Sequence, residues 1–250
     1  MSYLTSQDLS AQILIGPKAG ARMNWQSYDD FDESRYKKKP FFGYSAGFTA
    51  DFKIKDRYSF QVDIMYTRLG KKIEGVADDL LKNTGIYHCL NTPIVYKVDF
   101  YETLWGREFK WFLGAGPNVN YWINGKGRLS SVELEEVNIK EVEYDILFKE
   151  YPEQSESGNL YIANPNRLQL GLIFSAGIEF EPALGQSILV DLRFEWGHSY
   201  LAQESGIFDD VIAYEDNLRA STHGIYLSVC YLFDIVSKGK KVKKAYFEKD

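Results

Sequence analysis

The chain has 250 residues, of which 45% are hydrophobic and 16% aromatic, and its formal net charge at pH 7 is −6. A net negative charge gives no electrostatic support to a nucleic-acid partner, so we expect none. No run of about 18 apolar residues occurs, which excludes a membrane-spanning helix but not membrane-spanning strands, and the length suits a single all-β barrel.

The first residues, 1–12, show neither the basic region nor the apolar core of a secretory signal. Residues 10–12 (SAQ) look like the tail of a cleavage site, so two interpretations compete at this point: a signal has been lost, or the protein is cytosolic. The two cysteines, Cys89 and Cys230, lie far apart and fit no metal-binding spacing. A disulfide between them stays an open alternative.

Apolar and polar residues alternate with a period of two along eight segments, which is the pattern of strands with one apolar face. In the sixth segment, Leu168, Phe174 and Phe180 share the apolar face. Several segments are much longer than the about five or six residues of a globular strand. In chain order, the predicted strands cover residues 13–25, 42–52, 58–67, 86–100, 109–123, 167–181, 187–197 and 224–235.

Long and short connections alternate between these strands. The long ones cover residues 26–40, 70–84, 124–165 and 198–221, and the shorter ones cover 53–57, 101–108 and 182–186. An up-and-down meander places all long loops at one end, which is typical of outer-membrane barrels with long extracellular loops and short periplasmic turns. The sequence therefore predicts an all-β, eight-stranded antiparallel up-and-down transmembrane β-barrel. Its expected parts are an N-terminal segment (1–12), the barrel (13–236) and a basic periplasmic tail (237–250).

A soluble lipocalin-like barrel also alternates, with its apolar face inward, but three features favour the membrane. Most segments reach the about 9–11 residues that cross a bilayer at a tilt of about 45°. The polar faces are rich in glycine, which suits a narrow lumen and not a water-facing strand. Aromatic residues gather near the strand ends of the apolar face, as in an interfacial girdle. These residues are Trp25, Tyr58, Tyr66, Trp111, Tyr121, Trp196 and Tyr231.

Charged residues on the polar faces are expected to fill the lumen. The interior of an eight-stranded barrel is just wide enough for side chains, so we interpret these charges as a packed, paired core and keep a narrow solute channel as an alternative. Arg167, Glu179 and Glu181 of the sixth strand are also expected to need partners there. The predicted lumen charges are Lys18, Arg22, Asp51, Asp63, Lys97, Glu179, Asp191, Arg193 and Glu195.

Six pieces of the chain, between about residue 13 and 235, have a familiar order: IGPKAGARMNW, GYSAGFTADFKIKDRYSFQVDIMYTRLGKK, LNTPIVYKV, WFLGAGPNVNYWI, GLIFSAGIEFEPALGQSILVDLRFEWGHSYL and GIYLSVCYLF. In these pieces the chain resembles the PorT-like family of outer-membrane β-barrels, which is typical of bacteria that use the type IX secretion and gliding apparatus. The resemblance implies the outer membrane of a Gram-negative bacterium, an interaction or accessory role in a secretion or gliding assembly, and no catalytic motif. The chain departs from the family pattern in its 124–165 loop and its tail.

Two histidines are the candidates for chemistry. His198 and His223 lie at the expected extracellular ends of neighbouring strands, and Asp209 and Asp210 lie in the loop between them. An outer-membrane protease or lipid-modifying enzyme could use such groups as general base and orienting acid, but polar rim residues look the same. The GxSxG spacing of GYSAG at residues 43–47 gives no support to a hydrolase, because it lies inside a predicted strand and not at a strand-to-helix turn. No metal-ligand cluster occurs in the sequence. We therefore expect no enzyme activity and no catalytic, cofactor-binding or metal-binding residues, with the enzyme kept as an alternative.

Besides outer-membrane lipid, a protein partner is expected through the loops 124–165 and 198–221 or through the tail. The acidic 124–165 loop suits a solvated surface, a Ca²⁺ site or a basic partner, and its weak alternation predicts that the fifth and sixth strands extend as a hairpin. The tail suits an acidic partner, anionic lipid or a solubilising role. The acidic residues are Glu133, Glu135, Glu136, Glu141, Glu143, Asp145, Glu150, Glu153 and Glu156, and the tail lysines are Lys238, Lys240, Lys241, Lys243 and Lys244.

Overall fold

The computed structural model describes residues 12–55, 57–76, 81–104, 107–136, 138–152, 158–183, 185–208 and 214–235. Within this part of the chain, strands dominate and one short helix occurs. The elements are β1 (Gln12–Tyr28), β2 (Tyr36–Lys39), β3 (Phe41–Lys55), β4 (Tyr58–Gly75), β5 (Lys82–Leu104), β6 (Arg107–Ser130), α1 (Val132–Glu136), β7 (Val142–Leu147), β8 (Asn159–Tyr161), β9 (Leu168–Ala183), β10 (Gln186–Tyr200) and β11 (Ala220–Asp234).

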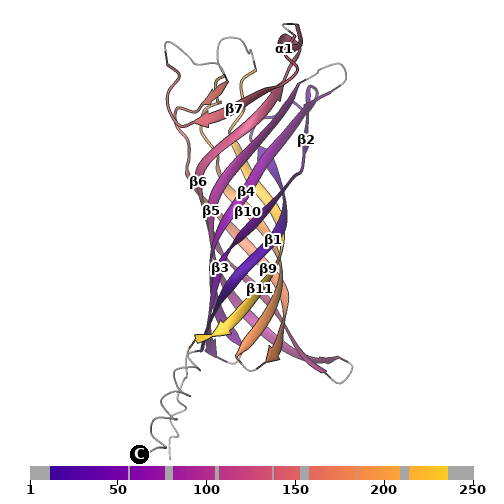
Figure 1. Cartoon of the computed structure of the whole chain (residues 1–250), viewed down its shortest axis with the longest axis vertical. Coiled ribbons are helices and arrows are strands. Elements are labelled where there is room, and N and C mark those ends of the chain that lie inside the picture. Colours follow the sequence, from indigo (N-terminus) through magenta and orange to yellow (C-terminus); the bar gives the residue numbers. More distant parts are fainter. Residues whose placement is uncertain are drawn as a thin grey trace, which may run out of the picture.

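Eight of these strands close into a barrel (Figure 1). Antiparallel ladders join them in the order β1, β3, β4, β5, β6, β9, β10 and β11. A further antiparallel ladder, from Leu14 opposite Asp234 to Tyr28 opposite Ala220, returns β11 to β1. Closure leaves the ring without an open edge, as the hydrocarbon of a bilayer requires. The predicted eight-stranded up-and-down barrel is confirmed.

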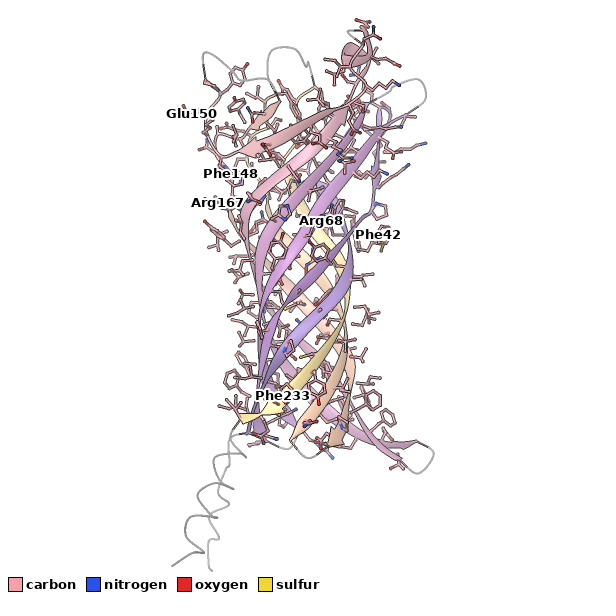
Figure 2. All side chains as sticks on the ribbon, viewed as in Figure 1. Phe42, Arg68, Phe148, Glu150, Arg167 and Phe233 are labelled. Carbon is pink, nitrogen blue, oxygen red and sulfur yellow. The ribbon has the colours of Figure 1, made fainter. Side chains whose placement is uncertain are left out.

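The apolar face of the strands points outward. Leu168, Phe174 and Phe194 are 56%, 46% and 40% exposed, and sticks project from the whole waist of the barrel (Figure 2). A water-soluble barrel would bury these side chains, because burial of apolar surface is the main favourable term in folding. Their outward position excludes the lipocalin-like alternative and matches a barrel that is solvated by lipid.

Several strands are longer than the sequence predicts. The prediction of a loop over residues 70–84 is wrong, because strands occupy both ends of this range. β4 continues to Gly75 and β5 begins at Lys82, so that Lys72 lies opposite Thr84 in the ladder. The alternation fades there because the outward face no longer needs apolar side chains once a strand has left the lipid. At the opposite end, β5 and β6 also continue past the rim as a two-stranded hairpin (Figure 1).

The predicted loop 124–165 contains more structure than expected. β6 runs to Ser130, α1 follows, and β7 pairs back on β6 while β8 lies parallel to β7. The predicted extension therefore exists, but β6 forms it with β7, whereas the sixth barrel strand, β9, begins only at Leu168. We call this end of the barrel, with β2, α1, β7 and β8, the loop end, and we call the opposite end the turn end.

Two smaller expectations are settled by the described residues. No helix among them is both long enough and apolar enough to cross a membrane. Cys89 and Cys230 are both free and buried, so the open disulfide alternative is excluded.

A charge in the middle of the outward face tests the orientation of the strands. Leu227 is 53% exposed and lies midway along β11. We expect Leu227→Arg to lower the free energy of unfolding from phospholipid vesicles by about 2–4 kcal/mol, because an arginine near the bilayer midplane loses its hydration. The measurement is a guanidinium titration of vesicle-inserted protein.

Ile139→Arg is the matched control. Ile139 is 42% exposed but lies between α1 and β7 at the loop end, where water can solvate the new charge. We expect a change within about 0.5 kcal/mol. Equal effects of the two substitutions would contradict a lipid-facing Leu227.

Candidate functional site

The lumen is the first candidate site. All nine predicted lumen charges are buried, although they carry full charges. A buried charge is tolerated when an opposite charge and further hydrogen bonds compensate it. In this barrel, the compensation comes from three groups of ion pairs at successive levels of the lumen, each of which joins side chains from at least two strands.

The middle group is a closed ring of four side chains. Lys18 Nζ on β1 lies 2.9 Å from Asp63 Oδ2 on β4 and 2.8 Å from Asp191 Oδ2 on β10. The Arg193 guanidinium contacts the same two oxygens, at 2.7 Å for Asp63 and 2.5 Å for Asp191. Gln61 also donates to Asp63 Oδ1 at 2.8 Å. Each cation therefore binds both acids, and the group is neutral as a whole.

The turn-end group contains as many lysines as acids. Lys97 Nζ lies 2.6 Å from Asp51, and Lys110 Nζ lies 2.5 Å from Glu179. Lys53 Nζ lies among three carboxylates at 3.3–3.5 Å. The group closes the turn end with side chains from β3, β5, β6 and β9. Its members are Asp51, Lys53, Lys97, Asp99, Lys110 and Glu179.

The third group lies toward the loop end. Arg22 on β1 pairs with Glu195 on β10, and beside them Asn91 donates a hydrogen bond to Asn118 at 3.0 Å. These side chains border a cavity of about 30 Å³. Such a volume has room for about one or two water molecules, which is too little for a hydrated solute.

A hydrophobic core closes the loop end above these polar groups. We call β7, β8 and residues 201–208 and 214–219 the cap. Apolar cap residues pack on the inward faces of β4, β5 and β6, and the Trp122 ring lies 4.9 Å from both Tyr87 and Phe148 in edge-to-face contacts. The core consists of Leu69, Leu81, Tyr87, Cys89, Trp122, Leu129, Tyr144, Ile146, Leu160, Ile162, Leu201, Ala202, Phe208 and Leu218.

One buried ion pair fastens the cap to the barrel wall. Lys71 on β4 pairs with Asp216 of the cap, and both side chains are almost completely inaccessible. Backbone hydrogen bonds in both directions join Asp216 to Gly206, at 2.8 and 2.9 Å. Burial lowers the pKa of Lys71, against the opposite effect of Asp216. Burial also raises the pKa of Tyr214, whose hydroxyl donates to Asp216 at 3.4 Å.

Several members of these groups were not among the predicted lumen charges. Lys53 lies on the same inward face of β3 as Asp51, and Lys71 lies on the same inward face of β4 as Asp63. Extending the period-two alternation past the predicted strand ends would therefore have found both lysines. Asp216 carries no such signal, because it reaches the interior from a loop. The additional charges are Lys53, Lys71, Asp99, Lys110 and Asp216.

The expectation that Arg167 and Glu181 point into the lumen is wrong. Glu181 is exposed near the turn end. Arg167 precedes β9 and donates to the carbonyl oxygens of Trp122 and Ile123, at 3.0 and 3.3 Å. Its guanidinium lies over the outward Tyr121 ring, 4.8 Å from the ring centre, so it belongs to the outer wall.

The histidine candidates do not form a catalytic arrangement in the described part of the chain. His198 is exposed, whereas His223 lies against Trp25 and shares a hydrogen bond of 3.2 Å with Ser221. Asp209 and Asp210 lie outside the described residues. His223 thus occupies an aromatic position of the outer wall.

The acidic loop forms no metal cluster among the residues that the structure describes. Glu141 and Glu143 instead lie beside Arg128, and Glu143 pairs with it at 2.9 Å. Glu135, Glu136, Asp145 and Glu150 are exposed. The side chain of Glu133, the residues Glu153 and Glu156, and the tail lysines Lys238, Lys240, Lys241, Lys243 and Lys244 lie outside the description.

Comparisons with known proteins agree with this geometry. The family model described as "Outer membrane protein beta-barrel domain" matches residues 5–199. The outer membrane protein OprG from Pseudomonas aeruginosa is similar in structure, with a TM-score of 0.56 and 9% sequence identity over 90% of this chain and 96% of that chain. This similarity concerns the fold alone. No curated protein matches the chain in sequence.

Two further solved structures match with lower TM-scores. Ail, the attachment invasion locus protein of Yersinia pestis, crystallised with the heparin analogue sucrose octasulfate, has a TM-score of 0.36 and 12% identity over 89% of this chain and 99% of that one. Neisserial surface protein A (NspA) has a TM-score of 0.36 and 11% identity over 88% and 97%. TM-scores of this size support no conclusion about the function of this chain.

The pair of Lys71 and Asp216 can be tested by removing one partner. We expect Lys71→Met to lower the free energy of unfolding by about 3–5 kcal/mol, because it leaves the Asp216 carboxylate buried without its cation. Adding Asp216→Leu should restore most of the loss, since no uncompensated charge remains. Urea titration of the protein in detergent micelles measures the three free energies.

An exposed ion pair of the same loop provides the control. Arg219 lies 2.7 Å from Asp29, and both side chains are about half exposed. We expect Arg219→Met to cost less than about 1 kcal/mol, as surface ion pairs do. A Lys71→Met variant that loses no more than this control would show that the buried pair does not hold the cap.

Proposed function

Since the chain belongs to the outer membrane protein β-barrel domain family and lies in the outer membrane, we propose that it is a closed, non-enzymatic barrel whose cap binds a protein partner. A fold of this kind serves many functions, so the proposal rests on the lumen and the cap. The observation that carries it is that ion pairs, amides and a hydrophobic core follow one another through the interior and fill it.

A filled interior argues against the narrow solute channel. A permeating ion would have to separate Lys18 and Arg193 from Asp63 and Asp191, which lie within 2.5–2.9 Å of each other. It would then have to pass the cap core, which is predominantly apolar. Both steps are costly, because a buried charge that loses its partner is destabilised by several kcal/mol.

The cap is suited to binding because its surface is fixed in advance. A loop that must be ordered on association loses affinity to the entropy of ordering, whereas a surface fixed by a packed core avoids this cost. The exposed side of the cap and of the adjacent α1 is predominantly acidic, so we propose a partner with a basic surface. The exposed acids of the cap, of α1 and of the residues that flank β7 are Glu135, Glu136, Glu141, Glu143, Asp145, Glu150, Glu204 and Glu215.

The resemblance of the strand motifs to PorT-like barrels supports a more specific proposal about the partner. We propose that the partner belongs to a secretion or gliding assembly, for which this barrel is an accessory subunit of the outer membrane. The lysines of the tail, residues 238–244, would then give a second contact on the periplasmic side. An outer-membrane enzyme is the less supported alternative, because His223 contacts Trp25 in the outer wall.

Electrical recording separates a closed barrel from a channel. We expect the purified protein to show no discrete open level in a planar bilayer, because the ion pairs and the cap core block the lumen. The measurement is single-channel conductance at low voltage, with a reconstituted porin as the positive control. A reproducible open level would favour the solute channel and overturn the closed barrel.

Photo-crosslinking tests the partner. A photoreactive amino acid in place of Glu204, which is exposed on the cap, should yield a crosslinked protein band in native membranes. The same amino acid in place of Phe48, which is 65% exposed on the lipid-facing wall, is the matched control and should not yield that band. A cap position that crosslinks no more than Phe48 would remove the support for a partner at the cap.

A further inference from the structure

A group of three cations lies on the outer wall toward the loop end. Arg68 on β4, Lys126 on β6 and Arg167 before β9 form no ion pair within the part of the chain that the structure describes. Lys39 and Lys72, which lie farther toward the loop end, both pair with Glu74. We call Arg68, Lys126 and Arg167 the basic ledge.

The ladder register brings the ledge together from separate parts of the sequence. Arg68 lies opposite His88, and His88 lies opposite Asn124 on β6. Arg167 lies just before the next barrel strand, β9. It is at the same level, because its Nη2 donates to the Ile123 carbonyl at 3.3 Å. Lys126 lies two residues beyond Asn124, toward the loop end. With strands about 4.8 Å apart, the row from Arg68 to Arg167 is roughly 14 Å wide.

Aromatic rings hold the two arginines in place of carboxylates. The Arg68 guanidinium lies 5.1 Å from the centre of the Phe41 ring. The Arg167 guanidinium lies 4.8 Å from the Tyr121 ring and 5.0 Å from the Phe148 ring. Arg68 and Arg167 lie at similar heights on the wall, Arg167 beside Phe148 (Figure 2). A cation–π contact orients the guanidinium but leaves its positive charge available to an anion.

The ledge lies directly above the lipid-facing belt. The row below it contains Tyr66, Leu90 and Tyr121, which pair across β4, β5 and β6 and are each 39–40% exposed. The Tyr66 ring stacks on His88, with ring centres 5.8 Å apart. Tyrosines in such a row mark the boundary between hydrocarbon and headgroups. The ledge cations therefore face the headgroup layer on the loop side of the membrane.

A groove in the wall adjoins the ledge. It has a volume of about 580 Å³, and Arg68, Lys126 and Arg128 line it together with Glu143 and Asp145. Arg128 is paired with Glu143 at 2.9 Å, so these two charges cancel. Asp145 lies opposite Lys126 on β7 and is the remaining acid of the lining. Arg68 and Lys126 together therefore leave the groove with one net positive charge.

We propose that the basic ledge binds the phosphorylated headgroup of an outer-leaflet lipid, whose acyl chains lie along Tyr66, Leu90 and Tyr121. Guanidinium groups are well suited to phosphate, because their planar donors match two phosphate oxygens at once. A row about 14 Å wide accommodates a headgroup with more than one phosphate. The site holds a specific lipid against one face of the barrel, independently of any protein at the cap.

Lipid binding to matched variants tests the proposal. The full chain in neutral detergent is titrated with lipid A that carries two phosphates, and the bound lipid is counted by native mass spectrometry. Each cation near a lipid surface contributes about 1 kcal/mol, or about five-fold in affinity. We therefore expect the Arg68→Gln, Lys126→Gln and Arg167→Gln triple variant to bind about 100-fold more weakly than the wild type.

Two controls separate the ledge from general effects of charge and folding. The Lys39→Gln, Lys72→Gln and Arg219→Gln triple variant loses the same number of charges, but its cations are paired with carboxylates, and it should bind within about five-fold of the wild type. Lys126→Gln alone alters one exposed side chain, so its expected five-fold loss is independent of any folding defect in the triple variant.

Three results would overturn the proposal. The first is equal lipid binding by the wild type and the ledge variants, and the second is an equal loss in the control triple variant. The third concerns the source of the phosphate: lipid A without phosphates binds as well as the diphosphorylated form, or inorganic phosphate at micromolar concentration displaces the lipid. The outcome does not depend on the cap partner, because no other protein is present in the titration.

Discussion

Lys18 and Arg193 bind the same two carboxylates, Asp63 and Asp191, in an interior that is too narrow to hydrate them separately. Loss of any one member leaves an unpaired charge away from water, at a cost of about 3–5 kcal/mol. The four side chains come from β1, β4 and β10, which do not pair with one another. The ion pairs therefore couple strands on different sides of the barrel. Lipid accepts any apolar side chain on the outer face, and a register slip of one residue would exchange the two faces. The ionic ring therefore selects the register in which the barrel closes.

The interior changes its chemistry along the axis as the surroundings of the wall change. Where lipid surrounds the strands, the apolar side chains point outward and the lumen contains ion pairs and amides. Beyond the tyrosine row at Tyr66 and the headgroup layer above it, water surrounds the wall. The inward faces of β4, β5 and β6 there contribute Leu69, Tyr87 and Trp122 to the core of the cap. The loops can then pack a hydrophobic core against the wall, as in a water-soluble protein. Lys71 and Asp216 form a buried ion pair where the cap meets the wall.

These differences explain which features the sequence could predict. Period-two alternation reports the contrast between the two faces of a strand, and this contrast is strong as long as lipid lies on one side. It therefore located all eight barrel strands and their closure order. It failed where β4 and β5 leave the membrane, because the stretch from Arg68 to Lys72 places charges on the outward face and resembles a loop. Arg167 was misplaced for a related reason: β9 begins one residue later, and an arginine on the outer wall is unexpected until its aromatic neighbours are known.

The core of the cap could not be predicted from local pattern, because its members come from many separate segments between Leu69 and Leu218 and no periodicity relates them. The function that we propose for the cap depends on where the acidic and basic side chains lie around its core. Acidic side chains cover the cap on the side that faces water. Arg68, Lys126 and Arg167, which form no ion pair with any described residue, lie below the cap beside the lipid. Attraction to anionic headgroups acts within about a Debye length of the membrane surface. The ledge would thus hold one level of the wall at the headgroup layer, while the acidic cap is repelled from that layer. In our proposals, this separation of acidic and basic side chains leaves the cap accessible to a basic partner and prevents contact between the cap and the membrane surface.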